Sequence, residues 1–390
     1  MKALLLDNMD EATRLTRAGR LSEAVALIQS VLRGRQPGTS PQTATAAPAS
    51  ATTLPTLHLE GRVLADAAAP SQPILPRVLG GLDVNLPVLR GLGGRSVPAS
   101  DIYPSAGTFL AKSFNNAAGT RAYKLYVPSR RADGPRPLIV MLHGCTQSAD
   151  DFAAGTRMNF AAEEHGCFVA YPEQPAAANV SRCWNWFKGG DQQRGMGEPA
   201  LIAGITRQIM ADYAIDPRRI YVAGLSAGGA AAAIMGETYP DLYAGVGVHS
   251  GLACGAARDL PSAFAAMRGD APARTSKPAG RDVGHAMPTI VFHGDRDTTV
   301  HPRNGAHVVA RAGGDVQVLA EPQAASQRGR FTRSVRRDAS GRSVLELWEI
   351  HGAGHAWSGG SAAGSFTDPY GPDATREMLR FFLEHAHPAN

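Results

Sequence analysis

The most informative run in the chain is Tyr221-Val222-Ala223-Gly224-Leu225-Ser226-Ala227-Gly228-Gly229. It begins as a short apolar strand, passes through Gly-x-Ser-x-Gly and ends in small residues typical of a closely packed helix. A serine on a sharp strand-to-helix turn needs glycine two positions before and two after it, because side chains there would collide with neighbouring backbone. The run therefore predicts a nucleophile elbow with Ser226 as the candidate nucleophile.

Strand and helix patterns alternate on both sides of this run. Apolar strands are expected at 138–142, 167–171, 220–223, 244–248, 289–292 and 345–350, and helices at 150–164, 199–213, 228–237, 304–311 and 374–384. Short apolar strands separated by helices are typical of an α/β fold whose mainly parallel central sheet carries helices on both faces. Residues 108–114 and 121–127 alternate apolar with polar side chains and predict an antiparallel hairpin at the sheet edge.

Composition divides the chain into three regions. Residues 1–35 predict a short helical hairpin, whose apolar face within 9–33 would pack on the main body, on a second copy of the chain or on an apolar particle. Residues 36–104 are rich in Pro, Ala and Gly with little periodicity, which predicts a flexible linker arm. Regular patterning starts near Gly107, so the α/β domain is expected to span 105–390.

Charge and hydropathy exclude several classes of protein. The chain has 39 Lys and Arg against 34 Asp and Glu, and the resulting charge of +5 comes from scattered arginines, which favours a solvated surface over a nucleic-acid or membrane partner. Its apolar runs are far shorter than the roughly 20 residues that span a bilayer, so no transmembrane segment is expected. Asp7, Asp10 and Glu11 interrupt the N-terminal leucines, which argues against a signal peptide.

A serine hydroxyl becomes an effective nucleophile when a histidine takes its proton and a carboxylate orients that histidine. The segment His293-Gly-Asp-Arg-Asp297 follows a predicted strand, and we favour Asp297 over Asp295 because it lies deeper in the loop and just before Val300. The segment His351-Gly-Ala-Gly-His355 follows the last strand, and we favour His355 over His351, which can still lie in the sheet. The prediction is a triad of Ser226, Asp297 and His355.

Two backbone N–H groups are expected to bind the oxyanion that forms during attack on a carbonyl. One is that of Ala227, directly after the serine, and the other is that of Cys145 in the loop after the strand 138–142. The Cys145 side chain either forms a disulfide with Cys183, joining two loops at the same sheet end, or both remain thiols. Cys167 fits a small buried apolar position, and Cys254 has no assigned role.

The loop after Cys183 concentrates aromatic residues in a chain that is 6% aromatic. Trp184 and Trp186 lie in it, and Trp357 follows the candidate base by two positions. At least one of them is expected in the core, but loops beside an active site commonly contact substrate. We therefore expect Trp184, Trp186 and Trp357 to form a wall for an apolar acyl or hydroxyacyl chain.

Five motifs taken together resemble the esterase family of polyhydroxybutyrate depolymerases. They are Leu-His-Gly-Cys-Thr-Gln at 142–147, Cys-Trp-Asn-Trp at 183–186, Gly-Leu-Ser-Ala-Gly-Gly at 224–229, His-Gly-Asp-Arg-Asp at 293–297 and Gly-His-Ala-Trp at 354–357. The resemblance covers residues 105–388 and implies an α/β-hydrolase fold. It also implies hydrolysis of short-chain polyhydroxyalkanoate esters or their oligomers through an acyl-serine, with no metal or organic cofactor.

Other readings remain open. Feruloyl and acetylxylan esterases share the fold, the order of the triad and similar motifs. A protein of another class would coat polymer granules through residues 1–35 and carry an inactive hydrolase body. Many members of the family are extracellular, and a Cys145–Cys183 bond favours an oxidising compartment, whereas the missing signal pattern favours a cytoplasmic or granule-associated protein.

Overall fold

The central feature of the molecule is a nine-stranded sheet. The computed structural model describes residues 97–130, 134–270, 287–313 and 331–388, so the predicted helical hairpin at 1–35 and most of the predicted linker lie outside the described residues. The strands of the sheet are β1 (Thr108–Asn116), β2 (Gly119–Val127), β3 (Arg136–Leu142), β4 (Phe168–Pro172), β5 (Ile215–Leu225), β6 (Gly245–His249), β7 (Thr289–Gly294), β8 (Phe331–Arg337) and β9 (Ser343–Ile350).

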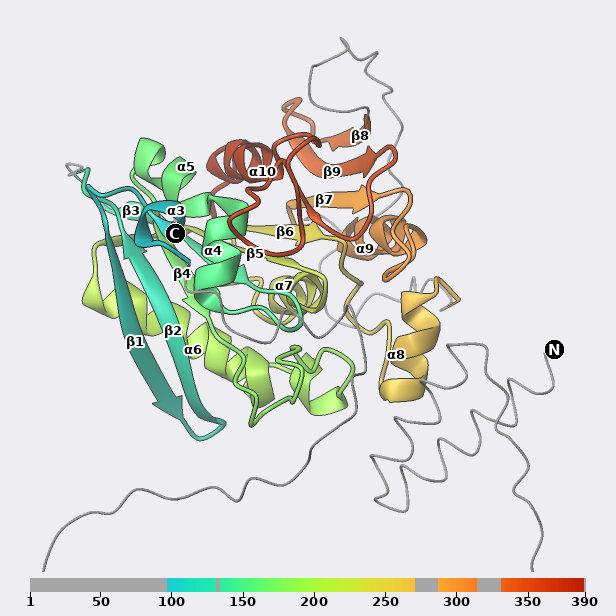
Figure 1. The fold of residues 1–390 in the computed structure, drawn as a ribbon, viewed down its shortest axis with the longest axis horizontal. Helices are drawn as coiled ribbons and strands as arrows, with labels where there is room; N and C mark the ends of the chain where they lie inside the picture. Colours follow the sequence, from blue (N-terminus) through green and yellow to red (C-terminus); the bar gives the residue numbers. More distant parts are fainter. Residues whose placement is uncertain (1–96, 131–133, 271–286, 314–330, 389–390) are drawn as a thin grey trace, which may run out of the picture. The chain divides into compact units, whose positions relative to one another are not determined.

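Their order in the sheet is β1-β2-β4-β3-β5-β6-β7-β9-β8. The six strands β4, β3, β5, β6, β7 and β9 run parallel to one another. The strands β1 and β2 at one edge and β8 at the other pair antiparallel (Figure 1). The expected hairpin is β1 and β2, paired from Thr108 opposite Val127 to Asn116 opposite Gly119. The prediction of an α/β fold with a mainly parallel sheet is confirmed.

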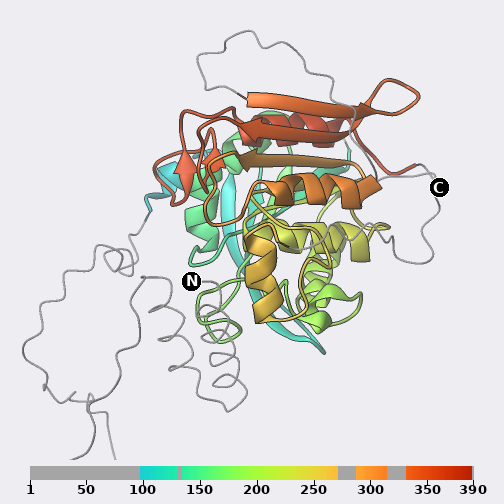
Figure 2. The same cartoon turned by 90° about the vertical axis from the view of Figure 1, so that its right-hand side faces the viewer.

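Helices cover both faces of the sheet, as Figures 1 and 2 show. On one face lie α6 (Gly197–Asp212), α7 (Ala227–Thr238), α8 (Leu260–Met267) and α9 (Arg303–Gly313), and on the other lie α3 (Ala99–Ile102), α4 (Ala149–Thr156), α5 (Met158–His165) and α10 (Ala374–Leu383). A short 3-10 helix, η2 (Gly189–Gln192), and a two-stranded pair, β10 (Trp357–Ser358) with β11 (Thr367–Asp368), complete the described elements.

The central strands are buried on both sides, because successive side chains of a strand point to opposite faces. In β5, Ile220 and Val222 enter the core beneath α6 and α7, whereas Tyr221 and Ala223 enter the core beneath α4 and α10. Each core removes a continuous set of apolar side chains from water, which is the main stabilising contribution to such a sheet.

The structure differs from the predicted elements in several places. The helix expected over 150–164 is two helices, separated at Arg157, whose φ of 56° is left-handed. The antiparallel strand β8 and the helix α8 were not predicted. Residues 97–104, assigned to the linker, belong to the domain instead: α3 buries Ile102, whose carbonyl accepts a hydrogen bond from the Asn159 side chain at 3.0 Å.

Candidate active site

Ser226 lies on the sharp turn between β5 and α7. Its φ of 58° and ψ of −120° are unusual for a residue with a side chain, and such strain persists only where the surrounding structure holds it. The Ser226 N–H donates to the carbonyl of His249 at 2.8 Å, which ties the turn to the end of the neighbouring strand β6. The sharp strand-to-helix turn predicted around Ser226 is present.

The two glycines of Gly-x-Ser-x-Gly are needed for close backbone contact. A Cβ on Gly224 would lie 2.4 Å from the Gly228 carbonyl, and one on Gly228 would lie 2.0 Å from the carbonyl oxygen of Leu142. The second contact brings the end of β3 against the first turn of α7. The loop after β3, which carries Cys145, therefore begins directly beside the turn of Ser226.

Asp297 and His355 form a buried pair at the carboxyl ends of β7 and β9. Oδ2 of Asp297 is 2.7 Å from Nδ1 of His355, and the Asp297 side chain is fully buried. The other carboxylate oxygen accepts the N–H groups of Thr299 at 2.9 Å and Val300 at 2.8 Å. Val300 is buried, so it packs this loop back onto the sheet.

The electrostatics keep Asp297 ionised. Burial acts to raise the pKa of Asp297, but hydrogen bonds from His293 and His355 outweigh it and hold that pKa well below its ordinary value. An ionised carboxylate accepts a hydrogen bond from Nδ1–H of His355, so the opposite ring nitrogen, Nε2, is left as the acceptor. The pair can therefore present a proton acceptor at the carboxyl end of the sheet.

The alternative residues, Asp295 and His351, form a second pair on the same two loops. Oδ2 of Asp295 is 3.1 Å from Nδ1 of His351, and its Oδ1 accepts the N–H of Gly352 at 2.7 Å. Both side chains are 41% exposed. Asp295 thus braces the loop after β9 from its exposed side.

Among the described residues, the Ser226 hydroxyl forms no hydrogen bond with the His355 imidazole. Catalytic hydrogen bonds are often long without substrate and shorten when it binds. The structure does connect the two loops indirectly. The His249 carbonyl accepts from Ser226, and the His249 ring accepts the N–H of Ser358, three residues after His355, at 3.0 Å.

The backbone N–H groups of Cys145 and Ala227 are the two predicted to bind an oxyanion. Within the described ranges, neither the N–H of Cys145 nor that of Ala227 donates to another group of the protein. Ala227 is the first residue of α7, where helical geometry leaves N–H groups without an internal acceptor. Both groups therefore have hydrogen-bonding capacity to offer a ligand.

The loop of Cys145 is held at three neighbouring points. The Gly144 N–H donates to Oε1 of Gln147 at 2.9 Å, and the Thr146 N–H donates to the Ser181 carbonyl at 2.7 Å. The Cys145 side chain forms a disulfide with Cys183, with Cα atoms 4.2 Å apart. These tethers flank the Cys145 amide on both sides and restrict its direction.

The three tryptophans of the predicted substrate wall lie mostly in the core. Trp184 and Trp357 are buried completely, so the expected substrate wall is wrong for these two residues; Trp186 is 7% exposed. The indole N–H of Trp184 donates to the His143 carbonyl at 3.1 Å, and that of Trp357 donates to Thr375 at 3.0 Å.

A buried polar network behind this loop was not predicted. Nε2 of His143 accepts the Gln174 N–H at 3.0 Å, and the Gln174 side chain donates to Glu198. Glu198 also accepts the backbone and side-chain N–H groups of Asn185 at 2.8 and 2.7 Å. Burial, with Asp191 nearby, raises the pKa of Glu198, and burial lowers the pKa of His143 to about 4.

His249 and Gln147 were also missed as site residues. A signal for His249 was available, because it directly follows an apolar strand whose carboxyl end lies beside the elbow. No sequence signal distinguishes Gln174 or Glu198 from ordinary surface residues, because their partners are distant in the chain.

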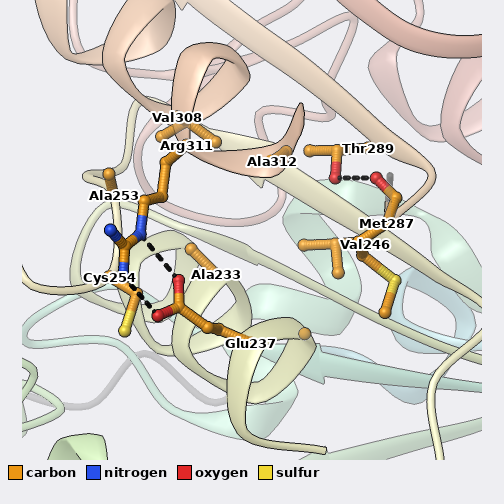
Figure 3. Close-up of a pocket in the computed structure, with 11 residues that line it drawn as sticks. Ala233, Glu237, Val246, Ala253, Cys254, Met287, Thr289, Val308, Arg311 and Ala312 are labelled. Atoms are coloured by element: carbon orange, nitrogen blue, oxygen red, sulfur yellow. Dashed lines mark hydrogen bonds and ion pairs between the residues drawn. The ribbon is translucent and has the colours of Figure 1, made fainter. Parts of the chain in front are cut away.

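A separate small cavity lies at the opposite ends of the strands (Figure 3). Its volume is about 30 Å³, room for a water molecule or two. It is bounded by Val246 and Thr289 near the starts of β6 and β7 and by the ion pair of Arg311 with Glu237, whose nearest atoms are 2.6 Å apart. In open α/β sheets ligands bind at the carboxyl ends of the strands, where Ser226, Asp297 and His355 lie.

No metal site is visible in the described part of the chain, since no three His, Cys, Asp or Glu side chains there are grouped to hold an ion. None of the described helices combines the length and apolar character needed to cross a membrane.

Sequence comparison identifies the family. A model of the family described as Esterase PHB depolymerase matches residues 121–317, half of the chain. The chain belongs to this family. The resemblance predicted from the five motifs is thereby confirmed, and the matched segment includes the elbow, the Cys145 loop and Asp297.

Individual relatives of this chain differ in their named activities. Poly(3-hydroxyalkanoate) depolymerase C of Paucimonas lemoignei is 33% identical over 270 residues, covering 67% of this chain and 63% of that relative. Feruloyl esterase B of Neurospora crassa is 31% identical over 202 residues, covering 48% and 68%. The chain thus spans less than two thirds of the depolymerase it matches.

Among solved structures, an acetyl xylan esterase from Aspergillus awamori superimposes with a TM-score of 0.53 at 21% identity. The match covers 64% of this chain and 94% of that one. At this identity the comparison bears on the fold alone, and it agrees with the α/β-hydrolase architecture of the described residues.

Proposed function

We propose that this protein is a serine hydrolase that cleaves carboxylic esters of short-chain polyhydroxyalkanoates or their oligomers through an acyl-serine. The observation that carries the proposal is the buried, ionised Asp297 bonded at 2.7 Å to His355, on loops at the same sheet end as the strained turn of Ser226. Strain and a shifted pKa concentrated at one end of a sheet are typical of an active site.

In the proposed first step, Oγ of Ser226 attacks the ester carbonyl while Nε2 of His355 takes the hydroxyl proton. Asp297 stabilises the imidazolium that forms and holds Nδ1 as the protonated nitrogen. The developing oxyanion accepts the N–H groups of Cys145 and Ala227. One such donor contributes on the order of 3 kcal/mol to transition-state stabilisation.

Collapse of the tetrahedral intermediate breaks the bond to the alkoxy oxygen, which leaves with the proton from His355 as the alcohol. Water then attacks the acyl-serine, with His355 again accepting a proton, and the acid product is released. As the bond between the acyl carbon and Oγ of Ser226 breaks, His355 returns the proton taken from water to that oxygen, which restores the serine hydroxyl and the neutral imidazole. The chemistry therefore needs no cofactor.

The polyester substrate class is supported by the relatives named as depolymerases, of which the one from Ralstonia pickettii is 27% identical over 280 residues. The second candidate is a carbohydrate esterase. It is supported by the feruloyl esterase relative and by a probable acetylxylan esterase of Aspergillus clavatus, 28% identical over 220 residues.

Active-site labelling tests the hydrolase proposal. A serine-directed phosphonate is expected to add once per chain, at Ser226, as mapped by peptide mass spectrometry. Ser226→Ala is expected to lower the turnover of p-nitrophenyl butyrate by about 10⁴- to 10⁶-fold, because the triad acts as a unit. Ser334→Ala, a substitution of a buried serine in the edge strand β8, is the matched control. A label on another residue, or full activity of Ser226→Ala, contradicts the proposal.

Substrate class requires a separate comparison. Initial rates on a soluble hydroxybutyrate trimer, amorphous polyhydroxybutyrate, methyl ferulate and acetylated xylan are measured with one enzyme preparation. We expect kcat/KM for the trimer to exceed that for methyl ferulate. Faster cleavage of ferulate or of acetylated xylan would favour the carbohydrate esterase and leave the acyl-serine mechanism in place.

A further inference from the structure

His249 is a buried residue that contacts both loops of the candidate triad. It ends β6, and its backbone carbonyl accepts the N–H of Ser226 at 2.8 Å. Its ring nitrogen Nε2 accepts the N–H of Ser358 at 3.0 Å, in the segment that follows His355. One residue thus bonds to the nucleophile's turn and to the loop of the candidate base.

Aromatic packing fixes the plane of the His249 ring. Trp357 stacks on it with centroids 5.1 Å apart and an interplanar angle of 26°, and Phe292 stacks at 5.7 Å and 13°. Its remaining nitrogen, Nδ1, is 3.2 Å from the Ser250 hydroxyl. Side-chain rotation would break the contacts with Ser358 and Ser250 and the stacking at once.

The bond with Ser358 requires a neutral ring, because Nε2 must be an acceptor. The proton of the neutral form then lies on Nδ1 and points to Ser250. Burial, with His293 and His355 nearby, lowers the pKa of His249 to about 3. The acceptor is therefore present across the pH range in which esterases are ordinarily assayed.

The order of the strands explains why such a bridge is needed. Ser226 follows β5 and His355 follows β9, and β6 and β7 lie between these strands in the sheet. No backbone pairing joins β5 to β9. The separation of the two side chains is set by loops, and His249 is bonded to both.

We propose that His249 is a positioning residue that sets the distance between the Ser226 hydroxyl and the His355 imidazole. The inference rests on the proposed function, because it assigns His249 a role in that same site. His249 does not touch the reacting atoms. It acts through its hydrogen bonds with the backbone N–H groups of Ser226 and Ser358. Loss of the imidazole removes the bond with Ser358 and displaces the loop of His355 relative to the elbow.

The test compares variants that remove or retain the acceptor. His249→Phe and His249→Leu remove it, the first preserving an aromatic ring. His249→Gln keeps an oxygen that can accept from Ser358. The matched control is His385→Phe, at another buried histidine, whose Nδ1 lies 2.7 Å from the Phe381 carbonyl at the end of α10.

Each variant is assayed for kcat and KM with p-nitrophenyl butyrate, for the rate of phosphonate labelling at Ser226 and for Tm. We expect His249→Phe and His249→Leu to lower kcat and the labelling rate by about 100-fold, with KM within about threefold, because a displacement near 1 Å has effects of this size. The kcat and labelling rate of His249→Gln are expected to be at least about tenfold higher than those of His249→Phe. His385→Phe is expected to lower Tm and leave kcat unchanged.

The outcomes separate the two proposals. If the wild type is active and Ser226→Ala inactive, but the His249 variants retain the kcat of His385→Phe, His249 is only a core residue and the positioning proposal is overturned. If His249→Gln is as slow as His249→Phe, the acceptor role is overturned as well. If Ser226→Ala keeps full activity, it is the proposed function that fails. When His249→Phe does not fold, His249→Leu decides.

Discussion

Two aspartate–histidine pairs lie on the same two loops, and they differ in depth. Asp297 and His355 are 2.7 Å apart with side chains 0% and 12% exposed, whereas Asp295 and His351 are 3.1 Å apart and both 41% exposed. The residue types and the sequence spacing between partners are nearly the same. A carboxylate and an imidazole in contact are therefore not by themselves evidence of catalysis. Burial of both side chains is what distinguishes the candidate catalytic pair from the pair on the surface.

Burial changes what each pair can do. In a water-poor environment the charge of Asp297 acts strongly on the imidazole it faces, while water and salt screen the charge of Asp295. The pKa of Asp295 is also lowered, because hydrogen bonds from Gly352 and His351 outweigh the opposing effect of burial. A shifted pKa alone therefore does not distinguish the inner pair from the outer pair.

The largest expected difference comes from the histidines. His355→Ala should lower kcat for p-nitrophenyl butyrate by about 10⁴- to 10⁶-fold, because the general base is lost. His351→Ala should stay within about threefold of wild type, since an exposed pair contributes little. Steady-state kinetics of both purified variants provide the measurement. Equal losses would remove the distinction between the pairs.

The aspartates should show the same contrast at a smaller scale. Asp297→Asn keeps the shape of the side chain but favours the wrong tautomer of His355, and we expect kcat to fall by about 10³- to 10⁴-fold. Asp295→Asn should lower kcat by less than about fivefold, through a loosened loop. A kcat for Asp295→Asn as low as that of Asp297→Asn would contradict the assignment of Asp297 alone as the carboxylate that orients the base.

The smallest effect concerns stability against pH. The pKa of Asp297 is held below the value of about 3.9 in an unfolded chain, so its ionised form stabilises the fold fully above about pH 5. As the pH falls through about 4, the unfolded chain binds the proton first and this stabilisation declines. The Tm difference between wild type and Asp297→Asn should therefore narrow below about pH 4, as measured by scanning fluorimetry.

The control for this titration is Asp295→Asn, which should differ little from wild type in Tm at any pH because the carboxylate is partly solvated. A Tm difference for Asp297→Asn that widens on acidification would mean that the folded-state pKa of Asp297 is raised, contrary to its hydrogen bonding.

The sequence predicts the central strands and the backbone of the site because both leave local signals. The apolar run of β5 and the glycines at 224 and 228 report burial and close backbone approach directly. The edge strand β8 has the sequence Phe-Thr-Arg-Ser-Val-Arg-Arg and was missed, because its only neighbour is β9 and its polar side chains resemble those of a loop.

Side-chain direction was harder to predict than backbone position. The loop of Trp184 was placed correctly beside the Cys145 loop, yet the indole points into the core, where the His143 carbonyl accepts its N–H. The network of His143, Gln174, Glu198 and Asn185 depends on partners between 13 and 31 positions apart in the chain. No pattern of hydropathy or spacing encodes such contacts, so they emerge only once the fold is known.

The turn at Ser226 also bears on how this chain tolerates mutation. A residue with a side chain at a positive φ of 58° lowers folding stability by roughly 1 kcal/mol or more, and glycine would relieve this. Selection for a robust fold alone would thus replace the serine readily. A serine at a backbone position that glycine would occupy at lower cost indicates a requirement other than stability.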